Sequence, residues 1–186
     1  MAKTSSNMLP LGTEAPSFKL LDTISGVERS LNELKGPNGT IVMFICNHCP
    51  YVIHINQELV LIAKELSTKG IKVIAISSND TENYPQDGPI AMEVHARRMK
   101  YSFPYLYDKT QQIAKAYDAT CTPDFYLFNP ELKLTYRGQL DESRPGNDIP
   151  VNGSDLRHAV SCLIKNKNNT RTQKPSIGCS IKWKQN

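Results

Sequence analysis

The sequence predicts a single α/β domain in which a central mixed β-sheet is flanked by helices. Apolar runs typical of buried strands alternate with segments whose apolar residues recur at three- and four-residue spacing, as in amphipathic helices. Late in this alternation two strand-like segments are separated by a short turn, which indicates a hairpin. A chain of 186 residues, 39% hydrophobic and 22% charged, has the size and composition of one globular domain.

The first half of the chain predicts an extended entry, a helical turn, two buried strands and a long helix. Residues 12–22 form the extended entry, and residues 31–39 a helical turn followed by a Gly-Pro-Asn-Gly loop. The β-branched and aromatic run at 40–45 is typical of a strand buried on both faces, as is the run at 71–77. Between them lies a helix that ends at Lys69-Gly70, a basic residue followed by a glycine cap. Its apolar face consists of Val52, Ile55, Leu59, Ile62 and Leu66.

The second half predicts the hairpin and three shorter helices. In order, the elements are a polar loop at 78–89, a helix at 90–101, a strand at 105–107, a helix at 111–117, strands at 124–128 and 132–136 around Asn129-Pro130-Glu131, and a last helix capped by Ser154. This order is β-α-β-α-β-α-β-β-α, which predicts helices on both sides of a mixed sheet.

Composition excludes a membrane protein and a disordered chain. The longest apolar stretch, residues 40–46, is far shorter than the ~20 residues that cross a bilayer. The first ten residues lack the apolar core of a secretory signal, so we expect a cytoplasmic protein that does not contact a membrane.

The net charge of +4 is concentrated near the C-terminus. Residues 156–186 carry seven Lys or Arg and no acidic residue. A basic tail can attract nucleic acid, but no aromatic-studded basic face accompanies this one. We therefore expect a domain at 1–166 and a basic tail at 167–186 that docks on it, without a nucleic-acid partner.

The five cysteines include the motif Cys46-Asn47-His48-Cys49. In a cytosolic chain, cysteines indicate redox or metal chemistry rather than a disulfide framework. The motif falls where a buried strand ends and a long helix begins, so unpaired amides and the helix dipole should favour a thiolate at Cys46. Cys49, one turn along, would then resolve the mixed disulfide that Cys46 forms with a substrate disulfide.

The same spacing is also typical of half a zinc site. Zinc would need two more ligands, and Cys121 and Cys179 are the obvious thiols. Neither belongs to a second C-x-x-C, so redox chemistry is favoured over a metal. A purely structural cysteine pair is the third alternative.

The sequence resembles the thioredoxin superfamily, in the branch that contains alkyl hydroperoxide reductase, thiol-specific antioxidant and redoxin proteins. The resemblance covers residues 12–166 and includes an N-terminal extension. It rests on Gly12-x-x-Ala15-Pro16-x-Phe18-x-Leu20, Cys46-x-x-Cys49 and Thr122-Pro123. The strings Cys-Asn-His-Cys-Pro-Tyr, Cys-Thr-Pro-Asp-Phe and Gly-Cys-Ser-Ile-Lys-Trp-Lys are similar to a bacterial peroxiredoxin-like subgroup.

The resemblance implies a thioredoxin-like fold with a cis peptide bond between Thr122 and Pro123, in a loop that packs against both cysteines and faces the substrate. Without it, an ordinary trans proline would be expected. The resemblance also implies that His48 stabilises the thiolate, which would make Cys46 more acidic than in a Cys-Gly-Pro-Cys thioredoxin. The alternative is a solvent-exposed imidazole.

Three departures from the family bear on the chemistry. The strand at 40–45 lacks the buried acid of thioredoxins, and Ile45 replaces their usual tryptophan. Relative to the Thr-x-x-Cys motif of peroxiredoxins, Cys46 replaces the threonine and Cys49 takes the peroxidatic position. The stretch just before Asp124 has no arginine, which leaves Arg137 or Arg144 as substitutes. These departures favour disulfide exchange over peroxide reduction.

The remaining thiols have less defined roles. Cys121 would be a third exchanging thiol or a buried small side chain. Cys179 would be a mobile resolving thiol or part of a docked tail, and Cys162 should be inert. We predict a thiol–disulfide oxidoreductase or peroxiredoxin-like antioxidant protein acting on protein or small-molecule disulfides or thiols, without a cofactor because electrons pass between thiols. The alternatives are a thiol peroxidase that uses Cys49, and a non-enzymatic zinc- or thiol-binding module.

Overall fold

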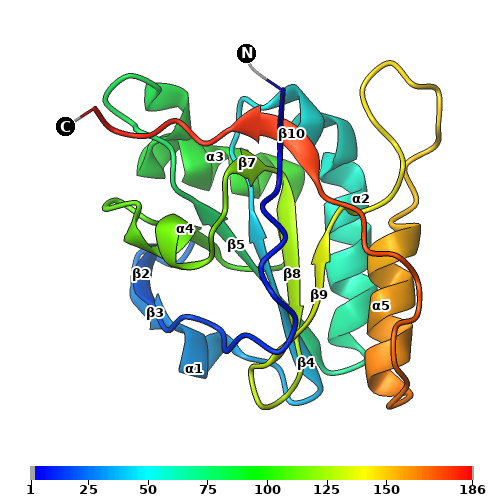
Figure 1. Ribbon diagram of the computed structural model, residues 1–186. Helices are drawn as coiled ribbons and strands as arrows, with labels where there is room; N and C mark the ends of the chain where they lie inside the picture. The colour runs from blue at the N-terminus through cyan, green and yellow to red at the C-terminus, as the bar shows by residue number, and fades with distance from the viewer. Residues whose placement is uncertain (1–2, 186) are drawn as a thin grey trace.

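The computed structural model describes residues 3–185 and shows the predicted alternation of strands and helices (Figure 1). The strands are β1 (Lys3–Ser5), β2 (Lys19–Asp22), β3 (Glu28–Ser30), β4 (Gly39–Phe44), β5 (Ile71–Ser77), β6 (Tyr105–Tyr107), β7 (Cys121–Thr122), β8 (Asp124–Phe128), β9 (Leu134–Gly138) and β10 (Ile177–Ser180). The helices are α1 (Leu31–Leu34), α2 (Pro50–Ser67), the 3-10 helix η1 (Pro85–Asp87), α3 (Pro89–Met99), α4 (Gln112–Ala116) and α5 (Ser154–Ile164).

The main sheet has seven strands in the order β3-β2-β6-β5-β4-β8-β9. β4 and β6 are both parallel to β5, whereas β8, β9, β2 and β3 pair antiparallel to their neighbours. This confirms the predicted mixed sheet. The parallel pair β4 and β5 requires a crossover connection, which α2 supplies.

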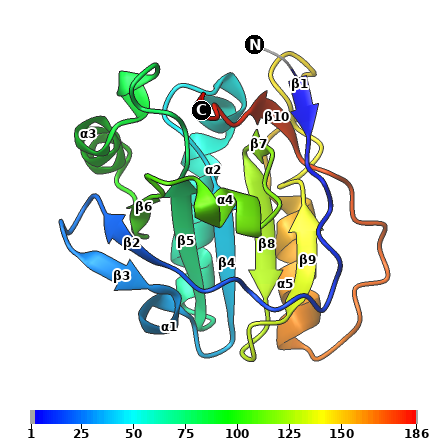
Figure 2. The same ribbon diagram turned by 60° about the vertical axis from the view of Figure 1, so that its left-hand side comes forward.

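Helices cover both faces of this sheet, as predicted (Figure 2). All of β4 is buried, and its side chains alternate between two cores. Ile41 and Met43 pack in the core formed with α2, α3 and α5, whereas Val42 and Phe44 pack in the core formed with α1, α4 and the N-terminal segment. The predicted apolar face of α2 is buried in full: Val52, Ile55, Leu59, Ile62 and Leu66. Within residues 3–185, no helix combines the length and apolar character that crossing a membrane requires.

A second, three-stranded sheet joins both ends of the chain in the order β1-β10-β7. Cys179 of β10 lies opposite Lys3 on one side and Thr122 on the other. β10 approaches β7 so closely that a Cβ at Gly178 would lie 1.9 Å from the Thr122 carbonyl oxygen, so this position requires glycine. The sequence predicts only a tail here, and the structure places that tail in a paired strand.

Several boundaries differ from those predicted. β9 begins at Leu134 because Leu132 has a left-handed φ of 59° and donates to the Asn129 carbonyl, which lengthens the turn. α4 begins one residue late because Gln111 is also left-handed, with a φ of 62°. In α5 the N-cap is Gly153, so Ser154 is the first helical residue rather than the cap.

Candidate redox site

The two motif cysteines lie in the loop between β4 and α2. α2 begins at Pro50, with Cys49 as its N-cap and the Val52 and Ile53 amides donating to the Cys49 carbonyl (3.0 and 2.9 Å). Cys46 therefore lies three residues before the N-cap. The prediction that the first-turn amides act on Cys46 is wrong, because Cys49 occupies that position.

Both sulfurs contact Thr122, next to a cis peptide bond at Thr122–Pro123. Cys49 Sγ lies 3.1 Å from the Thr122 carbonyl oxygen, to which its protonated thiol donates. Cys46 Sγ lies 3.5 Å from Thr122 Oγ1. The loop thus packs against both cysteines, as the family resemblance implies. Both cysteines are at most 1% exposed, so the pair is buried next to this loop.

The two thiols differ in acidity. The pKa of Cys46 is raised well above its ordinary value because its thiol hydrogen-bonds Cys49, and burial and the charge of Asp87 act in the same direction. The pKa of Cys49 is lowered to about 5 because the Cys46 thiol donates to it, with further hydrogen bonds from Cys179 and the Val52 amide. The Thr122 carbonyl is the neighbour that favours the protonated form of Cys49. These shifts run opposite to the hypothesis that Cys46 is the more acidic thiol.

His48 is held by a carboxylate rather than exposed. Its Nδ1 lies 2.6 Å from Asp87 Oδ2 and 4.0 Å from Cys46 Sγ, and its ring stacks on Tyr84 with centroids 5.6 Å apart. The side chain is 17% exposed, and its buried Nε2 has no hydrogen-bond partner among residues 3–185. The exposed-imidazole alternative is therefore excluded. The short bond of His48 goes to Asp87, and its contact with Cys46 is longer.

Asp87 is a buried acid that the sequence analysis missed. It is fully buried and accepts hydrogen bonds from the Asn47 amide and Asn79 Nδ2 (both 2.8 Å), as well as pairing with His48. It ends η1, in the loop predicted only as polar. The strand before the redox pair has no acid, as predicted, and a distant segment supplies one. The clustering of acid and amide residues in a loop carrying two prolines was the only signal, and such loops are usually exposed.

Three side-chain atoms that could bind a metal ion lie close together near the motif. Cys46 Sγ, a His48 ring nitrogen and an Asp87 carboxylate oxygen all lie within 4.8 Å of one another. Sulfur, imidazole and carboxylate are ligands that zinc accepts. The zinc alternative had proposed Cys121 and Cys179 as ligands, and neither belongs to this cluster.

The other cysteines occupy different surroundings. Cys121, in β7, is buried beside the Pro123 carbonyl at 3.9 Å, and burial strongly raises its pKa. Cys179, in β10, is buried in the same cluster as Cys46 and Cys49. Cys162 is half-buried on α5, 3.5 Å from His158 Nε2. The structure thus places Cys179, rather than Cys121, in the buried cluster that holds the motif cysteines.

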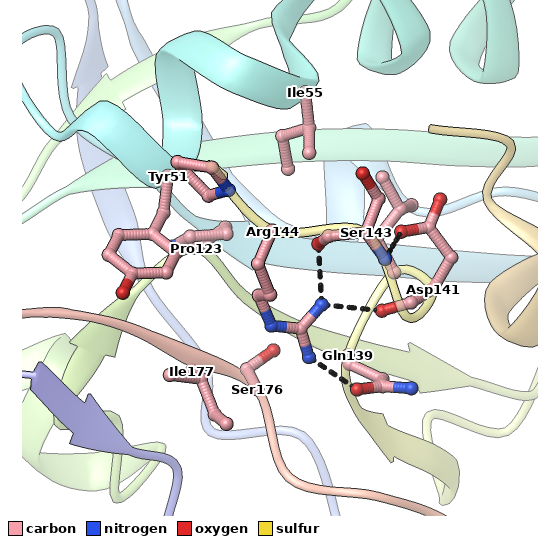
Figure 3. A pocket seen from close by; sticks show the side chains of 11 residues that line it. Tyr51, Ile55, Pro123, Gln139, Asp141, Ser143, Arg144, Ser176 and Ile177 are labelled. Atoms are coloured by element: carbon pink, nitrogen blue, oxygen red, sulfur yellow. Dashed lines mark hydrogen bonds between the residues drawn. The ribbon is translucent and has the colours of Figure 1, made fainter. Parts of the chain in front are cut away.

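A hollow borders the same loop and is lined by Tyr51, Pro123 and Arg144 among others (Figure 3). The Arg144 guanidinium donates to the carbonyl oxygens of Asp141 and Ser143, each at 2.6 Å, and to Gln139. Its buried Nε has no partner among residues 3–185. Its hydrogen bonds thus go to its own loop and not to Cys49.

Residues 11–137 match the family model described as AhpC/TSA family. The chain belongs to the AhpC/TSA family. This AhpC/TSA chain is 29% identical over 141 residues to the thiol-disulfide oxidoreductase ResA of Bacillus subtilis. The aligned region covers 71% of this chain and 70% of the relative.

Solved structures agree with the assignment of the fold to the thioredoxin superfamily. An uncharacterized conserved protein from Geobacillus kaustophilus is 53% identical, with a TM-score of 0.97 over 99% of this chain and 97% of its own. The thioredoxin domain of a thiol-disulfide oxidoreductase from Bacteroides vulgatus has a TM-score of 0.64 at 21% identity, over 84% of this chain and 99% of its own. The second similarity shows the thioredoxin-like fold alone.

Proposed function

We propose that this thiol-dependent oxidoreductase exchanges electrons with protein or small-molecule disulfides through Cys46 and Cys49, with the Thr122–Pro123 loop binding the substrate. The observation that carries the proposal is the contact of both sulfurs with Thr122. A buried thiolate next to a thiol is the resting state of a reducing dithiol. The ResA relative, named a thiol-disulfide oxidoreductase, supports the same chemistry.

In this reaction Cys46 attacks and Cys49 resolves. The Cys49 thiolate takes the proton of Cys46 as the Cys46 sulfur attacks one sulfur of the substrate disulfide, which releases the first substrate thiolate. Cys49 returns that proton to the departing thiolate and then attacks the Cys46 sulfur of the mixed disulfide. The products are the Cys46–Cys49 disulfide, one substrate thiol and one thiolate. The substrate gains the two electrons that the pair loses.

The test compares wild type, Cys46→Ser and Cys49→Ser in insulin-disulfide reduction and in hydrogen-peroxide consumption. Exchange predicts that both variants lose insulin reduction and that Cys49→Ser accumulates a mixed disulfide on Cys46. A mixed disulfide that forms only on Cys49, in Cys46→Ser, would reverse the assigned roles. Insulin reduction that survives in both variants would refute the proposal. Metal analysis of the purified protein tests the zinc alternative.

A thiol peroxidase that uses Cys49 is the second candidate. The N-cap position of Cys49 and its pKa of about 5 favour it, because the thiolate is the nucleophile toward peroxide. The Cys49 thiolate would attack one peroxide oxygen and become a sulfenic acid as the O–O bond breaks, and the departing alkoxide or hydroxide would take a proton from solvent. The Cys46 thiol would then attack the Cys49 sulfur, form the disulfide and release water. Against it, Arg137 donates to Gln173 and Arg144 to its own loop, so neither supports Cys49. Peroxide turnover that survives in Cys46→Ser but is lost in Cys49→Ser would favour this candidate.

A further inference from the structure

We infer that Cys179 is a second disulfide partner for Cys49, so that Cys49 forms either of two disulfides, with Cys46 or with Cys179. The inference rests on the proposed function, because it requires Cys49 to form and exchange a disulfide with Cys46. It differs in assigning a catalytic role to a strand that lies 130 residues along the chain from the motif.

The geometry places Cys49 and Cys179 against the same residue, Thr122. Cys179 is paired in register with Thr122, whose carbonyl oxygen is 3.1 Å from Cys49 Sγ. β10 also packs against α2, and Cys46, Cys49 and Cys179 belong to one buried cluster. The Cys46 and Cys179 thiols both contribute to the lowered pKa of Cys49. Cys49 is therefore the sulfur that has both other thiols of this cluster as neighbours.

Cys179 is fixed in this position by backbone hydrogen bonds on both sides. The Ser6 amide donates to the Ser176 carbonyl at 3.0 Å, and the Ile181 amide donates to the Thr120 carbonyl at 2.9 Å. Between them, β10 makes the close approach to Thr122 that only Gly178 permits. The thiol is thus already beside Cys49 in the reduced chain, and it does not need a mobile tail to reach it.

Cys121 does not share this position, although it precedes Thr122 in the sequence. Its thiol donates to the Pro123 carbonyl at 3.9 Å, and it lies outside the buried cluster that holds Cys46, Cys49 and Cys179. Successive residues of a strand point to opposite faces, so Cys121 and Thr122 cannot both face the redox pair. Cys121 is therefore the matched control for Cys179.

The exchange needs no external oxidant once the Cys46–Cys49 disulfide exists. The Cys179 sulfur attacks Cys49, the Cys46–Cys49 bond breaks, and the Cys49–Cys179 bond forms. The Cys46 sulfur leaves with the electron pair and takes the proton that Cys179 gives up. One disulfide and one thiol are present before and after. The result is a free Cys46 thiol in a chain that still stores two oxidising equivalents.

The decisive experiment treats folded Cys46→Ser with diamide, which accepts the two electrons and two protons of a thiol pair. After trapping with N-ethylmaleimide, peptide mass mapping without reductant should find a Cys49–Cys179 disulfide. In Cys46→Ser/Cys179→Ser, the fraction of Cys49 found in a disulfide should be about tenfold or more lower than in Cys46→Ser. A neighbouring thiol in the same chain reacts as if it were present at millimolar or higher concentration, and this variant removes it. Cys46→Ser/Cys121→Ser should keep it. Circular dichroism checks that each variant is folded.

Two outcomes separate this inference from the proposed function. If wild type forms Cys46–Cys49 and reduces insulin, but folded Cys46→Ser never links Cys49 to Cys179, the inference is wrong and the proposed function stands. If wild type neither forms Cys46–Cys49 nor reduces insulin, the proposed function is wrong and the inference is lost with it.

Discussion

The lowered pKa of Cys49 makes a quantitative prediction about the reduced protein. A pKa of about 5 makes this residue about 99% thiolate at pH 7, whereas an ordinary thiol with a pKa of about 8.5 would be about 3% thiolate. Reduced wild type should therefore show one thiolate absorbance step at 240 nm with a midpoint near pH 5. Cys49→Ser should lack this step. Cys46→Ala should raise its midpoint, because the principal hydrogen-bond donor is lost.

The same shift predicts how stability depends on pH. Because the folded-state pKa lies below the unfolded one, the thiolate stabilises the reduced fold fully above about pH 8.5. This stabilisation declines as the pH falls and is lost below about 5. At pH 7 it should amount to about 3 kcal/mol. Urea unfolding of reduced wild type and Cys49→Ser should thus differ more at pH 7 than at pH 4.5.

Cys162→Ser is the control, because the half-buried Cys162 thiol on α5 lies outside the buried cluster of Cys46, Cys49 and Cys179. This variant should leave the thiolate absorbance step and the pH dependence of urea unfolding unchanged. A first thiolate step above pH 8 in wild type, or an acidic step that persists in Cys49→Ser, would refute this account of the site. The Thr122 carbonyl at 3.1 Å would then dominate and keep Cys49 protonated.

Three further predictions concern residues around the site. Asp124 is fully buried, and burial raises its pKa to about 7, so the stability of wild type relative to Asp124→Asn, measured by urea unfolding, should fall as the pH rises from 4 to 7. Asp87→Asn should lower the pKa of Cys46 by removing a nearby negative charge, measured by the pH dependence of alkylation in Cys49→Ser. An unchanged alkylation profile would contradict the expected change in the pKa of Cys46. Asp87→Asn should also lower the free energy of unfolding by about 1–3 kcal/mol, because Asn47 and His48 lose the carboxylate that they hydrogen-bond. Gly178→Ala should destabilise the protein by about 1–3 kcal/mol, because its Cβ would overlap the carbonyl next to β10, and equal unfolding midpoints for variant and wild type would disprove the close approach.

The long elements could be predicted from sequence because their periodicity is strong. β4 and α2 carry continuous and helical apolar patterns, and the structure confirms both. The start of α2 was predicted too early, although Pro50 indicated it, since proline is favoured in the first helical turn and has no amide to donate. That difference of three residues moves the helix N-cap from Cys46 to Cys49.

Tertiary pairing determines the features that the sequence did not reveal. β7 and β10 have two and four residues, too few for a recognisable alternation, and they form strands only because they pair with each other and with β1. Asp87 becomes a site residue only when its loop folds over the redox motif. The division at residue 166, the cytoplasmic location and the absence of a nucleic-acid partner stay predictions.

The sheet β1-β10-β7 has a practical consequence for anyone who expresses this protein. Its outer strand begins at Lys3, and its middle strand holds Cys179 six residues before the last described residue. An affinity tag or fusion partner placed before Lys3 would therefore extend from the strand that pairs with the one holding Cys179. Tagged and tag-cleaved preparations should be compared before any redox activity, or lack of it, is attributed to the enzyme itself.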